Sequence, residues 1–143
     1  MTKSEWKKEF QVPSDLSRVQ KVSAEVLSFL KPLALDEGVV FDVRLCLEEA
    51  LINAMKYGNG LDENLNVRMT VAYQEDRVQI TVEDQGPGFD PETLRDCTQE
   101  GNLLRNRGRG VYLMHHLMDE VNYNSKGNTV QMVKFLKKSA REA

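Results

Sequence analysis

Cysteine is scarce in this chain, and long apolar runs are missing. Its 143 residues contain two cysteines, Cys46 and Cys97, too few for a disulfide framework or a clustered thiolate metal site. No apolar run approaches the roughly 18 residues that a membrane-spanning helix needs. The charged N-terminus has no apolar segment of the kind found in secretory signals. We therefore expect a cytoplasmic protein that does not use a membrane as a partner.

The chain also lacks the basic excess that is usual in nucleic-acid-binding domains. It has 19 Lys and Arg against 22 Asp and Glu, a net charge of −3, so nucleic acid is not expected as the main partner. Its 41% apolar and 29% charged residues are ordinary for a soluble globular protein. The length suits one domain with a hydrophobic core. A single domain over residues 1–143 is expected.

Hydrophobic periodicity predicts helices in the first half of the chain. A helix capped by Ser14 or Asp15 should end near Pro32, and a second should run from after Gly38 to about Tyr57. Before them, residues 10–12 favour a short strand.

Alternating apolar residues predict strands in the second half. One hairpin is expected from 66–73 and 77–83, another from 121–124 and 129–136, with a helix from about 109 to 118 between them. The element order predicts an α/β (α+β) two-layer sandwich, with a mixed, mainly antiparallel sheet and helices on one face.

The second predicted helix carries a polar motif, Glu48-Glu49-Ala-Leu-Ile-Asn53-Ala54. Residues four apart share a helical face, so Glu49 and Asn53 stack one turn apart. Asn53 lies close to the apolar face, where a polar side chain needs a partner. Its amide oxygen suits a hard cation such as Mg²⁺, and the Glu49 carboxylate can orient or deprotonate a nucleophile. Taken alone, the motif is better explained as a solvated glutamate pair beside a locally bonded asparagine.

A second motif follows the strand predicted at 77–83: Asp84-Gln-Gly86-Pro-Gly88-Phe89. Its glycines let the backbone turn and approach a ligand without a Cβ clash. A carboxylate at a strand end can accept a hydrogen bond from an exocyclic amine such as adenine N6. The alternative is an ordinary turn, because the same residue types are common in turns.

A polar segment from 85 to 107 leads into a third motif, Arg107-Gly108-Arg109-Gly110-Val111. A loop of that length inside a compact domain is usually functional. Glycines that open an apolar helix expose free N–H groups and the positive end of the helix dipole, which suits phosphate. No Gly-Lys-Ser/Thr follows, so this is not a Walker A loop. A flexible loop end is the alternative.

The order and spacing of the three motifs are more specific than any one of them. Together they resemble the N, G1 and G2 boxes of the Bergerat-fold ATPases, which include gyrase B, sensor histidine kinases and mismatch-repair ATPases. The matching residues are Glu49-x-x-x-Asn53-Ala54, Asp84-x-Gly86-x-Gly88-Phe89, Gly108-x-Gly110-x-x-Leu113-Met114 and Met118-Asp119-Glu120-Val121. Within the superfamily the chain resembles the anti-sigma-factor serine/threonine kinases of bacterial partner-switching systems. The resemblance covers about residues 10 to 136 and implies the Bergerat ATP-binding fold.

The resemblance implies a role for each matching residue. Asn53 would ligate the Mg²⁺ that bridges the phosphates of ATP, Glu49 would be the general base or an orienting carboxylate, and Asp84 would bind adenine N6. Residues from about 90 to 107 would form the ATP lid, whose arginines the sequence does not rank. The other residues implied in nucleotide binding are Gly86, Gly88, Phe89, Arg105, Arg107, Gly108, Arg109, Gly110 and Val111.

The function implied by the resemblance is that of an ATP- and Mg²⁺-dependent serine/threonine-protein kinase acting in transcription regulation. Such a kinase would sequester a sigma factor and phosphorylate a STAS-domain antagonist of the anti-sigma factor on Ser or Thr. Relatives also suggest a homodimer. The alternative is a non-enzymatic module that binds ATP, or only a protein partner, and switches through lid order. The core of a sensor histidine kinase is disfavoured, because no phospho-acceptor helix pair fits before Phe10.

Overall fold

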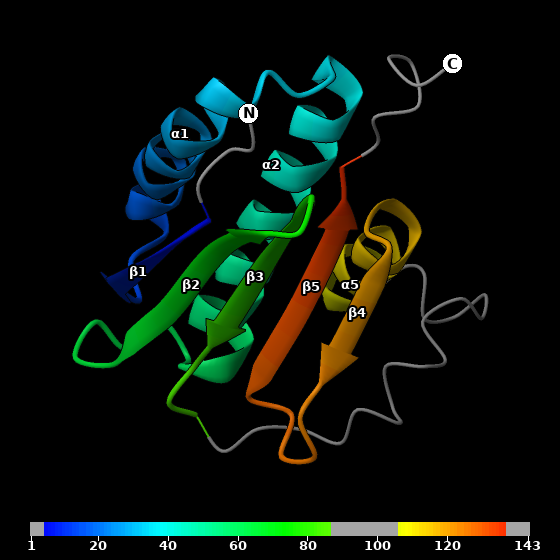
Figure 1. Cartoon of the computed structure of the whole chain (residues 1–143). Helices are drawn as coiled ribbons and strands as arrows, with labels where there is room; N and C mark the ends of the chain where they lie inside the picture. The colour runs from blue at the N-terminus through cyan, green and yellow to red at the C-terminus, as the bar shows by residue number, and fades with distance from the viewer. Residues whose placement is uncertain (1–4, 87–105, 137–143) are drawn as a thin grey trace.

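The structure is a computed structural model that describes residues 5–86 and 111–136 in full and residues 106–110 by their backbone. Five strands form one sheet in the order β1-β2-β3-β5-β4, and each described pair of neighbours is antiparallel. Helices α1, α2 and α5 cover one face of this sheet (Figure 1). The predicted two-layer α+β fold is confirmed. No parallel pair occurs among the described strands, so the sheet is antiparallel rather than mixed.

The elements follow the predicted order closely. The strands are β1 (Trp6–Pro13), β2 (Asn66–Gln74), β3 (Arg77–Glu83), β4 (Glu120–Tyr123) and β5 (Thr129–Phe135). The helices are α1 (Val19–Leu30), α2 (Glu37–Asn53) and α5 (Asn106–Leu117). Two short 3₁₀ turns, η1 (Leu16–Arg18) and η2 (Lys31–Leu33), flank α1, and the π-helical segment η3 (Ala54–Gly58) continues α2. No described helix has both the length and the apolar character needed to cross a membrane.

The β2–β3 hairpin shows how local sequence sets the sheet. Every second side chain of both strands is buried toward the helices, as the alternating pattern predicts. Glu75 and Asp76 in the turn have φ values of 54° and 59°. A positive φ at both central positions is what a type I′ turn requires, and that turn matches the right-handed twist of the strands.

The hydrophobic core lies between the sheet and the inner faces of α2 and α5. These helices contribute Val43, Cys46, Leu47, Ala50, Leu51, Val111 and Met114, each at most 2% exposed. Full burial of a large apolar side chain stabilises a fold by about 1.5–3 kcal/mol. This packing holds α2 against β3 and β5, the strands whose ends border the site described below.

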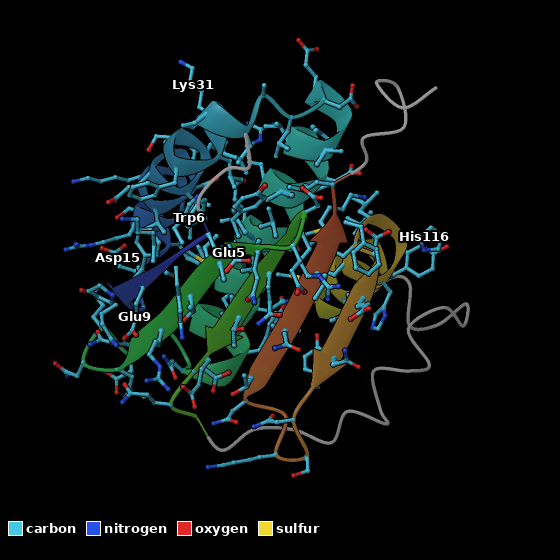
Figure 2. All side chains as sticks on the ribbon, in the orientation of Figure 1. Glu5, Trp6, Glu9, Asp15, Lys31 and His116 are labelled. Atoms are coloured by element: carbon cyan, nitrogen blue, oxygen red, sulfur yellow. The ribbon has the colours of Figure 1, made fainter. Side chains whose placement is uncertain are left out.

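The first strand is longer than predicted, beginning at Trp6 instead of Phe10. The Trp6 ring lies 6.1 Å from that of Phe29 in α1 and 6.2 Å from that of Tyr73 in β2, and Figure 2 shows Trp6 beside α1. Consecutive charged residues hide the alternation in the sequence. Lys8 lies on the inner side, where its ammonium group sits 4.8 Å from the centroid of the Phe29 ring, an attractive cation–π geometry.

The ends of the helices also differ from the predicted ones. Asp15, one of the two predicted caps, accepts a hydrogen bond from the backbone of Ser17 at the start of η1. The second helix begins before Gly38, because the Asp36 side chain accepts from the Gly38 N–H at 3.2 Å and caps its first turn. It stays α-helical only to Asn53 and then widens into η3.

Candidate functional site

A hollow opens at one end of the sheet, where α2, α5, the end of β3 and the β4–β5 turn meet. Its walls are largely apolar and its rim carries a small number of polar groups, the usual composition of a small-molecule site. The residues that line it are Ala50, Asn53, Ala54, Val82, Asp84, Met114, Tyr123, Gly127, Asn128, Thr129 and Val130. Two predicted site residues from separate motifs, Asn53 and Asp84, therefore face the same space.

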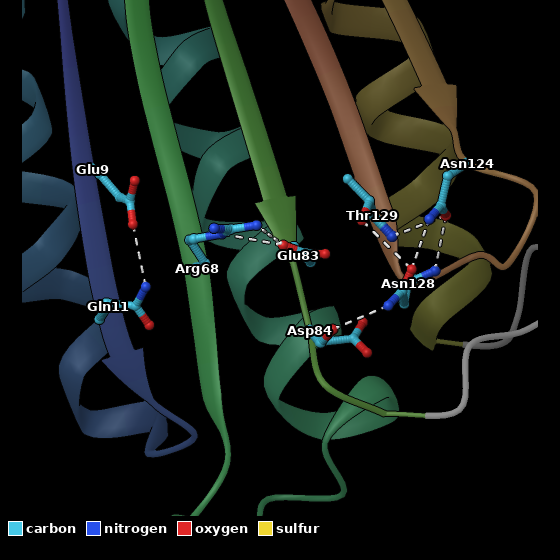
Figure 3. A network of polar contacts seen from close by, with 8 residues as sticks. All are labelled: Glu9, Gln11, Arg68, Glu83, Asp84, Asn124, Asn128 and Thr129. Carbon is cyan, nitrogen blue, oxygen red and sulfur yellow. Dashed lines mark hydrogen bonds and ion pairs between the residues drawn. The ribbon is translucent and has the colours of Figure 1, made fainter.

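Asp84 follows the last residue of β3 and is 8% exposed. One carboxylate oxygen, Oδ1, accepts a hydrogen bond from the Gly86 N–H at 2.9 Å. The Asp84 backbone is tied to the β4–β5 turn, because its N–H donates to the Asn128 carbonyl at 2.9 Å and its carbonyl accepts from Asn128 Nδ2 at 3.3 Å. Figure 3 shows this connection between the two segments. The carboxylate is thus held at the edge of the hollow.

Two glycines allow the segment after Asp84 to lie against the end of the helix. A Cβ added to Gly58 would fall 2.3 Å from Asp84 Cγ, and one added to Gly86 would fall 1.7 Å from the Gly58 carbonyl oxygen. Any side chain at either position would push these segments apart. The packing of Gly86 against η3 is enough to require glycine there. Its predicted part in adenine binding stays a prediction.

Asn53 is the last α-helical residue of α2 and lines the hollow. Its Nδ2 atom is buried, and no described residue provides a hydrogen-bond partner for it. A buried amide without a partner carries a desolvation cost, and such groups in native structures call for an explanation. A polar ligand in the hollow would satisfy this side chain.

Glu49 lies one helical turn before Asn53 and is half-buried. Burial, and to a smaller degree the charge of Glu48, raise the pKa of the Glu49 carboxyl above its ordinary value. A raised pKa moves a carboxylate toward the range that suits a general base near neutral pH. Glu49 is not among the described residues that line the hollow, so its predicted catalytic role rests on its place on α2.

The β4–β5 turn forms one wall of the hollow and is organised by Asn124. Its Oδ1 atom accepts hydrogen bonds from three backbone N–H groups, those of Gly127 (2.8 Å), Asn128 (3.0 Å) and Thr129 (3.1 Å). Asn124 Nδ2 also donates to Asn128 Oδ1 at 2.7 Å (Figure 3). Asn124 and Asn128 belong to none of the three sequence motifs. The sequence signal is the pair of asparagines around Gly127, which favours a turn but does not indicate a pocket.

The glycine motif predicted to bind phosphate lies in α5. The described part of the helix runs from Asn106, so Gly108 and Gly110 lie within the helix and not before it. Val111 is 1% exposed and packs in the core. Of the other predicted site residues, Gly88, Phe89 and Arg105 lie outside the described residues, as does nearly all of the predicted lid. The side chains of Arg107 and Arg109 are also outside them.

A family model described as the histidine kinase-like ATPase domain matches residues 12–134. The chain belongs to the histidine kinase-like ATPase family. The resemblance inferred from the three motifs is thereby confirmed.

Similar proteins point to one branch of the histidine kinase-like ATPases. The serine-protein kinase RsbW of Staphylococcus aureus strain MSSA476 is 30% identical over 140 residues, which cover 91% of this chain and 87% of that protein. The RsbW protein of strain Newman matches to the same extent. Among solved structures, the RsbU and RsbW domains of Rv1364c from Mycobacterium tuberculosis superpose with a TM-score of 0.62 at 14% identity. That match covers 92% of this chain and 32% of the other, and it supports the fold alone.

Proposed function

We propose that this chain is a cytoplasmic, ATP-dependent protein kinase that phosphorylates a STAS-domain antagonist on Ser or Thr and sequesters a partner such as a sigma factor. The observation that carries the proposal is the convergence of Asn53 and Asp84 on one hollow, with the Asn53 amide left without a partner among the described residues. The serine-protein kinase name of the RsbW relatives supports the type of reaction.

In the proposed complex the adenine ring lies in the hollow and its N6 amine donates to Asp84. The apolar side chains of Val82, Met114 and Val130 line the hollow and would pack against a heteroaromatic ring. Asp84 discriminates among purines, because guanine presents an acceptor oxygen where adenine presents a donor amine. The first turn of a helix has backbone N–H groups that lack intrahelical partners, and we propose that such groups of α5 donate to the phosphate oxygens.

Asn53 fits a place in the phosphate and metal part of the site. Its amide oxygen is the type of ligand that a hard cation such as Mg²⁺ prefers. Its buried Nδ2 has no hydrogen-bond partner among the described residues. Bound Mg²⁺ would supply charge neutralisation on the phosphates. Phosphoryl transfer depends mainly on positioning and electrostatic stabilisation, and the chain contributes both by fixing Asn53 on a helix that is packed into the core.

Glu49 is the proposed general base for the transfer step. The hydroxyl oxygen of the acceptor Ser or Thr forms a bond to the γ-phosphorus while the bond from this phosphorus to the β–γ bridging oxygen breaks, and ADP leaves. The hydroxyl proton passes to the Glu49 carboxylate. Burial that raises the pKa of Glu49 makes it a better proton acceptor than an exposed glutamate.

Transfer of radiolabelled γ-phosphate to a purified STAS-domain protein tests the proposal. The wild-type chain should label Ser or Thr of that protein, and Glu49→Ala should bind ATP but transfer phosphate about 10²–10⁴ times more slowly. Glu48→Ala is the matched control and should keep most of the wild-type rate, because Glu48 points about 100° away around the helix and its charge is the smaller cause of the raised pKa of Glu49. If the wild type binds ATP and transfers none, the non-enzymatic switch becomes the better account.

A further inference from the structure

Asn59 directly follows η3 and belongs to none of the three sequence motifs. It is 5% exposed, and both polar atoms of its side chain are used. Nδ2 donates to Ser14 Oγ at 2.9 Å and to the Asn66 carbonyl at 3.1 Å, while Oδ1 accepts from the Gln85 N–H at 2.8 Å. A buried asparagine bonded to three separate segments fixes their relative positions.

The bond to Gln85 links Asn59 to the proposed adenine carboxylate. Gln85 is the residue after Asp84, so its amide nitrogen belongs to the peptide group that Asp84 begins. The Asn59 backbone in turn donates to the Ala54 carbonyl at 2.8 Å, which closes the π-helical turn immediately after Asn53. One residue therefore ties the part of the helix that carries Asn53 to the backbone that carries Asp84.

The π-helical segment explains why this connection is possible. A π turn holds one more residue than an α turn and is frequent at functional sites. Here it places Gly58 directly beneath the carboxylate, where an added Cβ would lie 2.3 Å from Asp84 Cγ. The missing side chain of Gly58 leaves room for the Asp84 carboxylate, and Asn59 accepts the hydrogen bond from the Gln85 N–H. The end of η3 therefore sets the distance between Asp84 and the helix.

We propose that Asn59 is a positioning residue for purine recognition, one that holds Asp84 at the distance needed to accept from adenine N6. This inference rests on the proposed function, because it takes Asp84 as the adenine contact. Asn59 has no contact with the nucleotide in this proposal. It acts through the Gln85 N–H and through the packing of η3 against the Asp84 segment.

The test compares the affinities of the purified full chain for ATP and ITP, which differ at the group that Asp84 faces. ITP carries an acceptor oxygen in place of the N6 amine, so the ratio of the two affinities reports on the position of Asp84. Asn59→Ala should lower the ATP/ITP affinity ratio roughly tenfold, the loss expected when a charged hydrogen bond is misplaced. Thermal unfolding would show in parallel that the variant is folded.

Ser14→Ala is the matched control. It removes a bond of Asn59 that lies away from Asp84, so it should reduce thermal stability and leave the ATP/ITP ratio unchanged. If Asn59→Ala does not fold, Asn59→Ser replaces it, because the serine oxygen is one bond shorter and does not reach the Gln85 N–H.

The possible results separate this inference from the proposed function. A wild type that prefers ATP, together with a folded Asn59 variant that keeps the same ATP/ITP ratio, would overturn the positioning role and leave the proposed function standing. A wild type that binds neither nucleotide would overturn the proposed function and the positioning role with it.

Discussion

Replacing Gly58 by alanine probes the contact between η3 and Asp84 with a single methyl group. The Cβ would lie 2.3 Å from Cγ and Oδ2 of Asp84, whereas ordinary van der Waals contact begins at 3.4 Å. The carboxylate must therefore move by about 1 Å, or η3 must shift by as much. The backbone of Gly58 is outside the left-handed region, so alanine is compatible with its conformation and the effect comes from the contact.

The size of the effect follows from the hydrogen bond that Asp84 is proposed to make with adenine. A bond of normal length that is stretched by about 1 Å is lost. A hydrogen bond to a charged group contributes about 1.5–3 kcal/mol, which corresponds to roughly 10- to 150-fold in Kd. Gly58→Ala should weaken ATP binding by this factor while the chain stays folded.

Isothermal titration calorimetry with Mg·ATP measures the change, and Gly60→Ala is its control. Gly60 has a φ of +62° with nothing within 4 Å of an added Cβ. Alanine there should cost about 1–2 kcal/mol of stability through backbone strain and leave the affinity unchanged. The double variant Gly58→Ala/Asp84→Ala should bind like Asp84→Ala alone, because the two changes remove one interaction. Wild-type affinity in folded Gly58→Ala would refute the reasoning.

Two further predictions concern the carboxylates of the site. Asp84→Ala should lose about 1.5–3 kcal/mol of ATP binding free energy and most of the preference for ATP over GTP. Competition titration of the two nucleotides measures this preference, and an unchanged preference in the variant would show that Asp84 does not face the purine. Burial, and to a smaller degree the charge of Glu48, raise the pKa of Glu49 in the folded chain. The stability that this raised pKa contributes is present below the unfolded pKa of about 4.5. It is lost as the pH rises through the folded pKa. Wild type should therefore lose stability relative to Glu49→Gln as the pH rises above about 4.5. A difference in unfolding free energy between the two proteins that stays constant with pH, measured by urea unfolding, would contradict this.

The strength of the sequence signal decides how much of the fold could be predicted. The β3 strand was predicted with its observed bounds, because Val78, Ile80 and Val82 alternate without interruption. The start of β1 at Trp6 was missed, because consecutive charged residues hide the alternation and pairing with β2 decides the outcome. Tertiary pairing of this kind outweighs local propensity.

The two polar residues that face the hollow could be found from the sequence. The residues that hold the surrounding backbone in place could not. Asn53 and Asp84 belong to motifs whose order and spacing are specific. Asn59 and Asn124 act through hydrogen bonds to backbone groups, and Asn59 reaches partners 45 and 26 residues away. Such contacts depend on the folded path of the chain, and in the sequence both residues resemble ordinary turn asparagines.

Calorimetric titration of the wild-type chain and of Asn53→Ala with ATP, in the presence and absence of Mg²⁺, tests the central claim most directly. The claim is that the hollow between Asn53 and Asp84 holds Mg·ATP. Wild type should bind ATP in a Mg²⁺-dependent manner, and Asn53→Ala should lose this binding because it removes the proposed metal ligand. The thermal unfolding of Asn53→Ala should stay cooperative, because the buried amide that it removes has no hydrogen-bond partner among the described residues. Unchanged Mg·ATP affinity in the folded variant, or no ATP binding by the wild type, would contradict the account.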